Sequence, residues 1–280
     1  MAQSIKKQDS VSSIIMFIFN VFLVERGINS IPLKKILHLV QPFNKNETAV
    51  RMGLSRAVQN GILRNVRKDN EVHYELTESG VEAVEEWRRV LAEFRHNIDA
   101  QVAGWSGFWN TVFISDSTFN NSDTLALVLD ILAEHKYGML SKNLWICPYG
   151  RSSAFAKVLN MKKTESLGVQ IFESRPLQNN RVLANMVWGT EKLAARYSEF
   201  FTELNKEVQA LKQEKTAEGI LPFLHRFGIQ LFEIIKDDPQ LPMEVLPEGW
   251  LGLEAARTFN GIREDLLPAA SEYIDQVLAE

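Results

Sequence analysis

The chain has 280 residues, enough for one large domain or for two or three small ones, and 45% of them are hydrophobic, which is ample for packed cores. The formal net charge is −4. The single cysteine, Cys147, excludes an intrachain disulfide and is typical of a protein from a reducing cytoplasm, where we expect this chain to act.

The charges are divided unevenly along the chain. Residues 1–68 hold 11 basic and 3 acidic side chains, a net charge of +8, whereas residues 69–280 carry a net charge of −12. This split suggests a basic head that binds a polyanion and a larger acidic body with another role. Chance clustering of lysines and arginines on a solvated face is the alternative.

An apolar run, residues 14–24, follows Lys6 and Lys7 near the start of the chain. A signal peptide is disfavoured because no small-residue cleavage site follows the run. A membrane span needs about 20 residues, and this shorter run is interrupted by Asn20. We therefore expect a buried first helix, capped by Ser12 or Ser13, and no membrane partner.

Two more helices are expected before residue 62. The first follows Ser30 and ends at Pro42, and the second begins at Asn44, with Glu47 as its capping-box partner. In this second helix an apolar stripe faces the core: Val50, Leu54, Ala57 and Val58. The opposite face is polar and basic: Thr48, Arg51, Met52, Ser55, Arg56 and Gln59.

A short hairpin is expected directly after these helices. Leu63–Val66 and Val72–Leu76 predict two strands around a turn at residues 68–70, and a further helix is expected from about Thr77 to Phe94. Three helices and a two-stranded wing in this order define a winged helix-turn-helix, which we expect to occupy residues 1–98.

Such a domain reads DNA with its third helix and wing. We expect Arg51 and Arg56 to contact phosphates or guanine edges, and the basic wing residues to follow phosphates or enter a minor groove. The alternatives are a solvated helix face and a winged helix that contacts only protein. The predicted DNA-binding residues are Lys45, Thr48, Arg51, Met52, Ser55, Arg56, Gln59, Arg64, Arg67, Lys68 and Asn70.

The middle and end of the chain change character. Strands are expected at 109–115, 139–147 and 169–173, with helices at 123–135 and 152–160 between them. This order is typical of a ferredoxin-like βαββαβ domain, which we place at residues 104–189. From Thr190 the pattern is helical, apart from a proline-rich loop, which predicts a C-terminal helical domain at 190–280. The expected fold class is therefore α+β.

The sequence resembles the PaaX family of bacterial repressors at four places. The expected third helix is similar to the family's recognition helix, and Trp105–Trp109 to the start of its central domain. Leu144–Pro148 resembles a tryptophan-bearing strand of that domain. The most specific match is Asp238–Pro242, which is followed by Leu246–Gly252, because a proline-punctuated tryptophan loop has no generic reason to occur there.

The resemblance implies a homodimeric repressor of a catabolic operon, one for phenylacetate in the best-known members. It would bind a pseudo-palindromic operator and leave it on binding an acyl-coenzyme A such as phenylacetyl-coenzyme A. Aromatic and basic side chains could bind that effector. The alternatives are core packing for the aromatic side chains and a solvated helix face for the basic ones. The candidates are Trp145, Arg151, Lys157, Lys162, Lys163, His225 and Arg226.

Catalytic patterns are weak in this sequence. The five histidines are scattered, and no spacing resembles a metal site, a glycine-rich phosphate loop or a GxSxG elbow. Asp116 follows the first strand of the middle domain, where a ferredoxin-like nuclease would hold a metal ion. A metal-dependent nuclease is thus the alternative function, but one carboxylate is a weak ligand set. We expect no enzyme, no metal and no cofactor.

Overall fold

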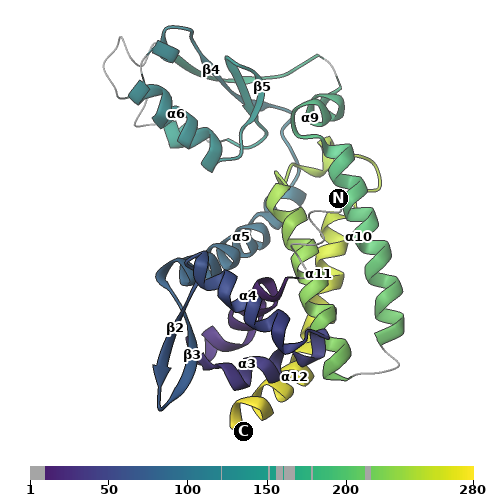
Figure 1. The fold of residues 1–280 in the computed structure, drawn as a ribbon. Helices are drawn as coiled ribbons and strands as arrows, with labels where there is room; N and C mark the ends of the chain where they lie inside the picture. Colours follow the sequence, from purple (N-terminus) through teal and green to yellow (C-terminus); the bar gives the residue numbers. More distant parts are fainter. Residues whose placement is uncertain are drawn as a thin grey trace. The chain divides into compact units, whose positions relative to one another are not determined.

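The computed structural model describes residues 10–120, 122–150, 152–155, 160, 168–177, 179–211 and 216–280. It is an α+β protein, as the sequence predicts, and its contacts group the chain into two compact units (Figure 1). Unit 1 combines residues 1–95 with 197–237 and 251–280, whereas unit 2 combines residues 96–196 with 238–250.

Unit 1 begins with a helix that changes its hydrogen-bonding pattern. Helix α2 (Val11–Ile18) runs into a π-helical turn, η1 (Phe19–Leu23), and then into a 3-10 turn, η2 (Val24–Arg26). The cap is Ser10, whose hydroxyl accepts the backbone N–H of Ser13 at 3.2 Å, so the expected cap at Ser12 or Ser13 was wrong. The helix is buried along its apolar run, as expected.

The next segment contains a strand that the sequence did not predict. Ser30–Pro32 forms β1, and α3 (Leu33–Val40) starts only after it. A 3-10 turn, η3 (Gln41–Phe43), ends at Asn44, which has a left-handed φ of 54° and therefore cannot open a helix. Helix α4 (Glu47–Gln59) is capped instead by Asn46, whose side-chain oxygen accepts the Ala49 N–H at 2.8 Å.

The expected hairpin is present as β2 (Leu63–Lys68) and β3 (Glu71–Leu76). Its turn residues, Asp69 and Asn70, have φ of 48° and 69°, the positive values that a tight two-residue hairpin turn requires. The sheet has three antiparallel strands in the order β1-β3-β2, because Ser30–Pro32 pairs with the free edge of β3.

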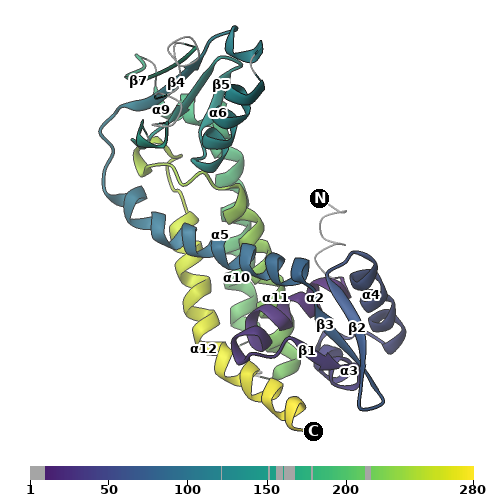
Figure 2. The ribbon, with the colours of Figure 1, turned by 90° about the vertical axis from the view of Figure 1, so that its left-hand side faces the viewer.

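All or part of four long helices completes unit 1, and three of these helices come from the second half of the chain. The remaining helices are α5 (Glu78–Val102), α10 (Thr190–Leu211), α11 (Ala217–Asp237) and α12 (Gly252–Ala279). The end of α12 lies beside α3, where the Tyr273 hydroxyl donates to the His38 carbonyl at 2.8 Å (Figure 2). The Lys35 ammonium also donates to the Leu278 carbonyl. The C-terminal helix is therefore fastened to the N-terminal segment.

Unit 2 is built on a four-stranded sheet with the strand order β5-β6-β4-β7, in which all neighbours are antiparallel. One face packs on α6 around a core that includes Val112, Val128 and Phe155. The elements are β4 (Trp109–Ile114), η4 (Thr118–Asn120), α6 (Ser122–Glu134), β5 (Gly138–Ser141), β6 (Leu144–Cys147), η5 (Ser152–Phe155), β7 (Val169–Ser174), α9 (Asn180–Trp188) and η6 (Met243–Val245).

One helix of unit 2 was not predicted, and part of another, predicted helix lies outside the described residues. Helix α9 was not predicted, and it contacts β5. Of the helix expected at 152–160, the described residues show the 3-10 turn η5, and residues 156–159 lie outside the described part. None of the helices in the described parts of the chain is long and apolar enough to cross a membrane.

The residues expected to form a third, C-terminal domain contribute to both units. Most of α10 and the whole of α11 and α12 pack with the N-terminal segment, whereas the proline-rich loop at 238–250 belongs to unit 2. In that loop the Gln240 carbonyl accepts the Tyr149 hydroxyl at 2.5 Å, and the Asp238 carbonyl accepts the Lys136 ammonium at 3.1 Å. These carbonyls lie outside any helix and are open to side-chain donors.

Candidate nucleic-acid interface

One face of α4 anchors it in unit 1. Val50, Leu54 and Ala57 are almost completely buried, as their spacing predicts. Gly53 lies on the same face, where a Cβ atom would come within 2.4 Å of the Val11 Cβ on α2. The Ser12 hydroxyl donates to the Gly53 carbonyl at 3.0 Å. Side chains of α2 thus contact the backbone of α4 directly, and α2 fixes the orientation of α4.

The opposite face of α4 is open to solvent. The six side chains predicted to read DNA from this helix are all exposed: Thr48, Arg51, Met52, Ser55, Arg56 and Gln59. Lys45, which precedes the helix, is half-buried. Met52 is 53% exposed, unusual for a large apolar side chain, and it leaves an apolar contact point within a polar face.

The two arginines of this face differ in their partners. Arg51 forms an ion pair with Glu47, one turn earlier on the helix, at 2.6 Å. Within the described residues, the guanidinium group of Arg56 forms neither an ion pair nor a hydrogen bond. Arg56 is therefore free to accept a phosphate or a base edge, whereas Arg51 must first give up a carboxylate partner.

The hairpin carries a second cluster of cations. Arg64, Arg67 and Lys68 are exposed on β2, and Asn70 is exposed in the turn. Glu75 on β3 lies between two of them, 3.0 Å from the Arg64 guanidinium and 2.5 Å from the Lys68 ammonium. The hydrogen bond from Lys68 is the main cause that lowers the pKa of Glu75 to about 2.

The charge of this hairpin is therefore smaller than its three cations suggest. Glu75 stays ionised at physiological pH and compensates one of the two cations beside it. Within the described residues, Arg67 forms no side-chain ion pair. Its guanidinium is the hairpin cation that is free for a phosphate, and it lies opposite Val72 in the strand register.

Of the residues predicted to bind an effector, the three that the structure describes are divided between the two units. Trp145 belongs to unit 2, where it is half-buried and packs against the core of the sheet. His225 and Arg226 are on α11 in unit 1. Four of the predicted residues lie outside the described part of the chain: Arg151, Lys157, Lys162 and Lys163.

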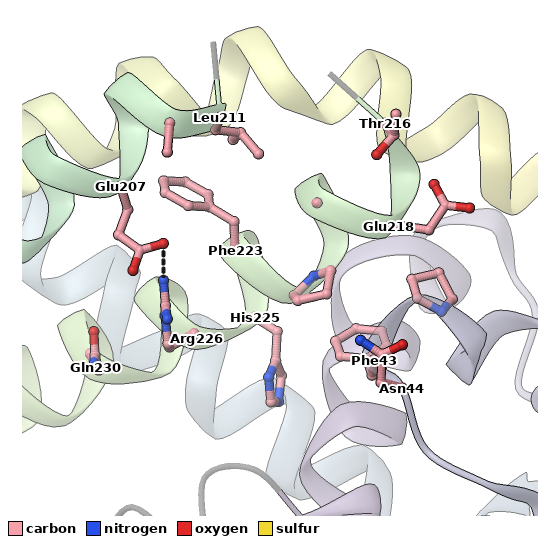
Figure 3. A pocket seen from close by; sticks show the side chains of 14 residues that line it. Phe43, Asn44, Glu207, Leu211, Thr216, Glu218, Phe223, His225, Arg226 and Gln230 are labelled. Carbon is pink, nitrogen blue, oxygen red and sulfur yellow. Dashed lines mark ion pairs between the residues drawn. The ribbon is translucent and has the colours of Figure 1, made fainter. Parts of the chain in front are cut away.

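His225 and Arg226 line a pocket of about 790 Å³ in unit 1 (Figure 3). His225 is only 4% exposed, its ring contacts Phe17 and Phe43, and its Nε2 atom lies 3.1 Å from the Ser13 hydroxyl. Arg226 points to Glu207, with which it forms an ion pair at 2.6 Å. Both side chains thus already have structural partners.

The alternative nuclease centre finds no support. The Asp116 carboxylate is 84% exposed, accepts a hydrogen bond from Asn143 and lies 3.6 Å from the Lys142 ammonium. Asn143 and then Lys142 lower its pKa. In the part of the chain that the structure describes, no three potential metal ligands come together.

The fold and these surfaces define a class: an α+β protein that presents a basic helix and hairpin on one of its two compact units. Two family profiles match the chain, one described as "PaaX-like protein" over residues 10–80 and one as "PaaX-like protein C-terminal domain" over residues 188–276. The chain belongs to the PaaX family. Helix α4 and the hairpin lie inside the first matched region, and the proline-rich tryptophan loop lies inside the second.

Among characterised proteins, the Escherichia coli (strain K12) protein called "Transcriptional repressor PaaX" is 26% identical over 278 residues. The alignment covers 95% of this chain and 84% of that protein. Among solved structures, the "Uncharacterized protein Rv0674 from Mycobacterium tuberculosis" is similar with a TM-score of 0.47 and 18% identity. That similarity covers 87% of this chain and 90% of the other.

The pairing of Glu75 was missed at the level of sequence, although a signal for it exists. A two-residue turn at Asp69 and Asn70 fixes the hairpin register, and that register places Glu75 opposite Arg64. Counting two residues along β2 from there places Val66 and then Lys68 on the same face of the hairpin. The carboxylate among the cations could thus have been predicted from the turn.

Proposed function

We propose that this chain is a transcriptional repressor that binds double-stranded DNA in the cytoplasm through a winged helix-turn-helix at residues 1–98. The observation that carries the proposal is the exposed face of α4, with the unpaired Arg56, next to a hairpin with the unpaired Arg67. A helix of this size fits the major groove, and a basic hairpin beside it can follow the phosphates. The proposal is for a regulator and not for an enzyme.

The surface chemistry favours DNA over a purely protein partner. The cores of interfaces between proteins contain few charged residues, whereas DNA interfaces are much more positively charged. The part of unit 1 formed by α4 and the hairpin has five cations in the candidate site besides Lys45: Arg51, Arg56, Arg64, Arg67 and Lys68. Two of its acids, Glu47 and Glu75, reduce this charge without removing it.

The test is DNA binding by the full chain, followed by fluorescence anisotropy. The probe is a duplex from the promoter region next to the gene, and a scrambled duplex is the competitor. We expect Arg56→Ala to weaken binding by about 1–3 kcal/mol, which is about 5- to 150-fold. The matched control is Arg257→Ala, an exposed arginine on α12.

Two results would remove the proposal. One is equal affinity for the promoter and scrambled duplexes, since a repressor must prefer its operator. The other is an Arg56→Ala variant that binds as tightly as the control variant. We expect Arg51→Ala to weaken binding less than Arg56→Ala, because the Glu47 ion pair is lost when Arg51 binds DNA.

The remaining parts of the proposal follow from the family resemblance. The chain would act as a homodimer on a pseudo-palindromic operator, with half-sites about 34–36 Å apart. Light scattering that finds a monomer on operator DNA would remove this part. Residues 104–189 would form a ferredoxin-like domain and residues 190–280 a helical one. The antiparallel strand order β5-β6-β4-β7 supports the first of these domains. The helices α10, α11 and α12 support the helical character of residues 190–280, although these residues contribute to both compact units.

We further propose that an acyl-coenzyme A such as phenylacetyl-coenzyme A releases the repressor from a catabolic operon. A ligand shifts DNA binding only as far as its affinities for the free and the DNA-bound states differ. The test is to add phenylacetyl-coenzyme A to the complex during the anisotropy measurement. An unchanged signal at saturating ligand would rule out this effector.

A further inference from the structure

A second pocket in unit 1 has a different charge from the one in Figure 3. It lies between α2–η1, α5, α11 and α12, and its volume is about 670 Å³. Small-molecule sites typically measure about 300–1,000 Å³. Four ionisable side chains line it: Glu25, Arg88, Arg95 and Arg263. Their net charge is +2, although the whole chain is acidic.

The pocket in Figure 3 is a poor place for an anion by comparison. Among the described residues, its ionisable lining apart from His225 consists of Glu207, Glu218 and Arg226. Arg226 is neutralised by Glu207, so Glu218 leaves the lining with a net negative charge. The charges of the described residues therefore favour a negatively charged ligand in the second pocket over the first.

Two of the three arginines in the second pocket have no ion-pair partner within the described residues. Arg88 donates to the Asn20 side-chain oxygen at 2.9 Å and lies 3.5 Å from Glu25. In contrast, the guanidinium groups of Arg95 and Arg263 form no ion pair or hydrogen bond with the described residues. Burial, followed by the positive charge of Arg95, lowers the pKa of Arg263, and the negative charges of Glu25 and Glu264 offset this only in part. A partly buried cation beside a like charge is costly unless an anion compensates it.

The rest of the lining is apolar and partly aromatic. Trp87 on α5 stacks on Phe232 of α11, with ring centroids 3.9 Å apart and planes inclined by 8°. Trp87 is half-buried and Phe232 is 8% exposed, so the stacked pair forms a fixed wall of the pocket. A flat apolar group binds well against such a wall.

We propose that this pocket binds a small organic anion with a flat apolar body. The anionic group is held by Arg263 and Arg95, and the apolar body lies against Trp87. Free carboxylates, sulfonates and the phosphates of a larger conjugate share this chemistry, and guanidinium groups bind all of them through charge-assisted hydrogen bonds.

Helix α2 lies between the pocket and α4, the helix of the candidate DNA-binding surface. Ser13, Phe17 and Asn20 line the pocket from α2 and η1, whereas their neighbour Ser12 donates to the carbonyl of Gly53 on α4. A ligand that displaces α2 therefore displaces α4. This coupling rests on the proposed function, whereas the binding of the anion does not.

The π-helical turn makes the α2–η1 side of the pocket adjustable. In η1 the Val24 N–H bonds the Phe19 carbonyl, five residues back, instead of the Asn20 carbonyl. Arg88 donates to that Asn20 carbonyl at 2.5 Å. An anion that attracts Arg88 competes with this bond, and π-helical turns of this kind occur often at functional sites.

The test uses the full chain without DNA and 8-anilinonaphthalene-1-sulfonate as a fluorescent probe. We expect saturable binding that Arg263→Gln weakens about 10-fold, the value of one charge-assisted contact. Arg257→Gln, on the exposed side of the same helix, is the matched control and keeps the wild-type affinity. Arg95→Gln, at an exposed position, is the second variant in case Arg263→Gln does not fold.

A competition experiment tests the need for a negative charge. Naphthalene-1-sulfonate should displace the probe about 10-fold more strongly than neutral 1-naphthol, and Arg263→Gln should abolish this preference. Equal displacement by the two compounds in the wild type would overturn the proposal. So would a folded Arg263→Gln variant, or Arg95→Gln in its place, that behaves like Arg257→Gln.

The same samples separate this inference from the proposed function. Arg263-dependent probe binding in a chain that does not bind promoter DNA would leave the pocket standing and remove the repressor. If the chain binds promoter DNA but its affinity for the probe does not depend on Arg263 and Arg95, the repressor proposal stands and the pocket proposal falls. Where both hold, naphthalene-1-sulfonate should weaken DNA binding by the wild type and not by Arg263→Gln.

Discussion

If the hairpin binds DNA as proposed, Glu75 should limit its affinity, and replacing Glu75 should change the salt dependence of binding. It pairs with both Arg64 and Lys68, so these three side chains together carry a charge of +1. Glu75→Gln raises this charge to +2 with almost no change in shape. Each phosphate neutralised adds about 0.9 to the slope of log affinity against log salt concentration. We therefore expect the slope to steepen by about one unit and the affinity at low salt to rise.

The assay is anisotropy with promoter duplex between about 50 and 200 mM salt, the range in which phosphate contacts dominate affinity. Glu254→Gln, which removes an exposed carboxylate from α12, is the control for overall charge and should leave the slope unchanged. The double variant Glu75→Gln/Lys68→Ala should return to the wild-type slope. A folded Glu75→Gln variant whose slope equals that of Glu254→Gln would refute the assignment of Arg64 and Lys68 to phosphates.

Two further predictions concern stability. Gly53→Ala should lower the free energy of unfolding by about 1–3 kcal/mol in urea denaturation, because its Cβ would overlap Val11; unchanged stability would contradict this close approach. The depressed pKa of Glu75 predicts a pH dependence. Its pairing stabilises the fold above pH 4.5 and is lost as the pH falls toward about 2, so the melting temperatures of wild type and Glu75→Gln should converge over that window. A pH-independent difference would rule this out.

Local periodicity was sufficient to predict α4 and its two faces. Buried Val50, Leu54 and Ala57 alternate with exposed Arg51, Ser55 and Arg56 because a helix turns by about 100° per residue. The hairpin was also predicted from local sequence, because two β-forming segments flank its turn residues. Its third strand was missed because Ser30–Pro32 is short and gains its structure from pairing with β3, which is distant in sequence.

The site residues were less predictable where they depend on tertiary contacts. His225 was a candidate for effector binding, but its ring is enclosed by Phe17 and Phe43, from segments about 180–210 residues away. Arg263 was not singled out, because a lone arginine in an amphipathic helix is indistinguishable from a solvated one. Its significance comes from Arg95 and from burial, neither of which is encoded locally.

The sequence suggested a basic head separate from an acidic body, but the compact units of the structure do not follow this separation. The basic N-terminal segment and the acidic C-terminal helices are separate in sequence, yet they pack together in unit 1. Arg26 pairs with Asp275 at 3.2 Å, and His38 lies 3.2 Å from Glu280. The acidic helices are thus part of the framework that holds the basic segment. The proposed anion pocket and α4 belong to one packed unit with α2 between them, so a ligand needs no flexible linker to influence the proposed DNA-binding face.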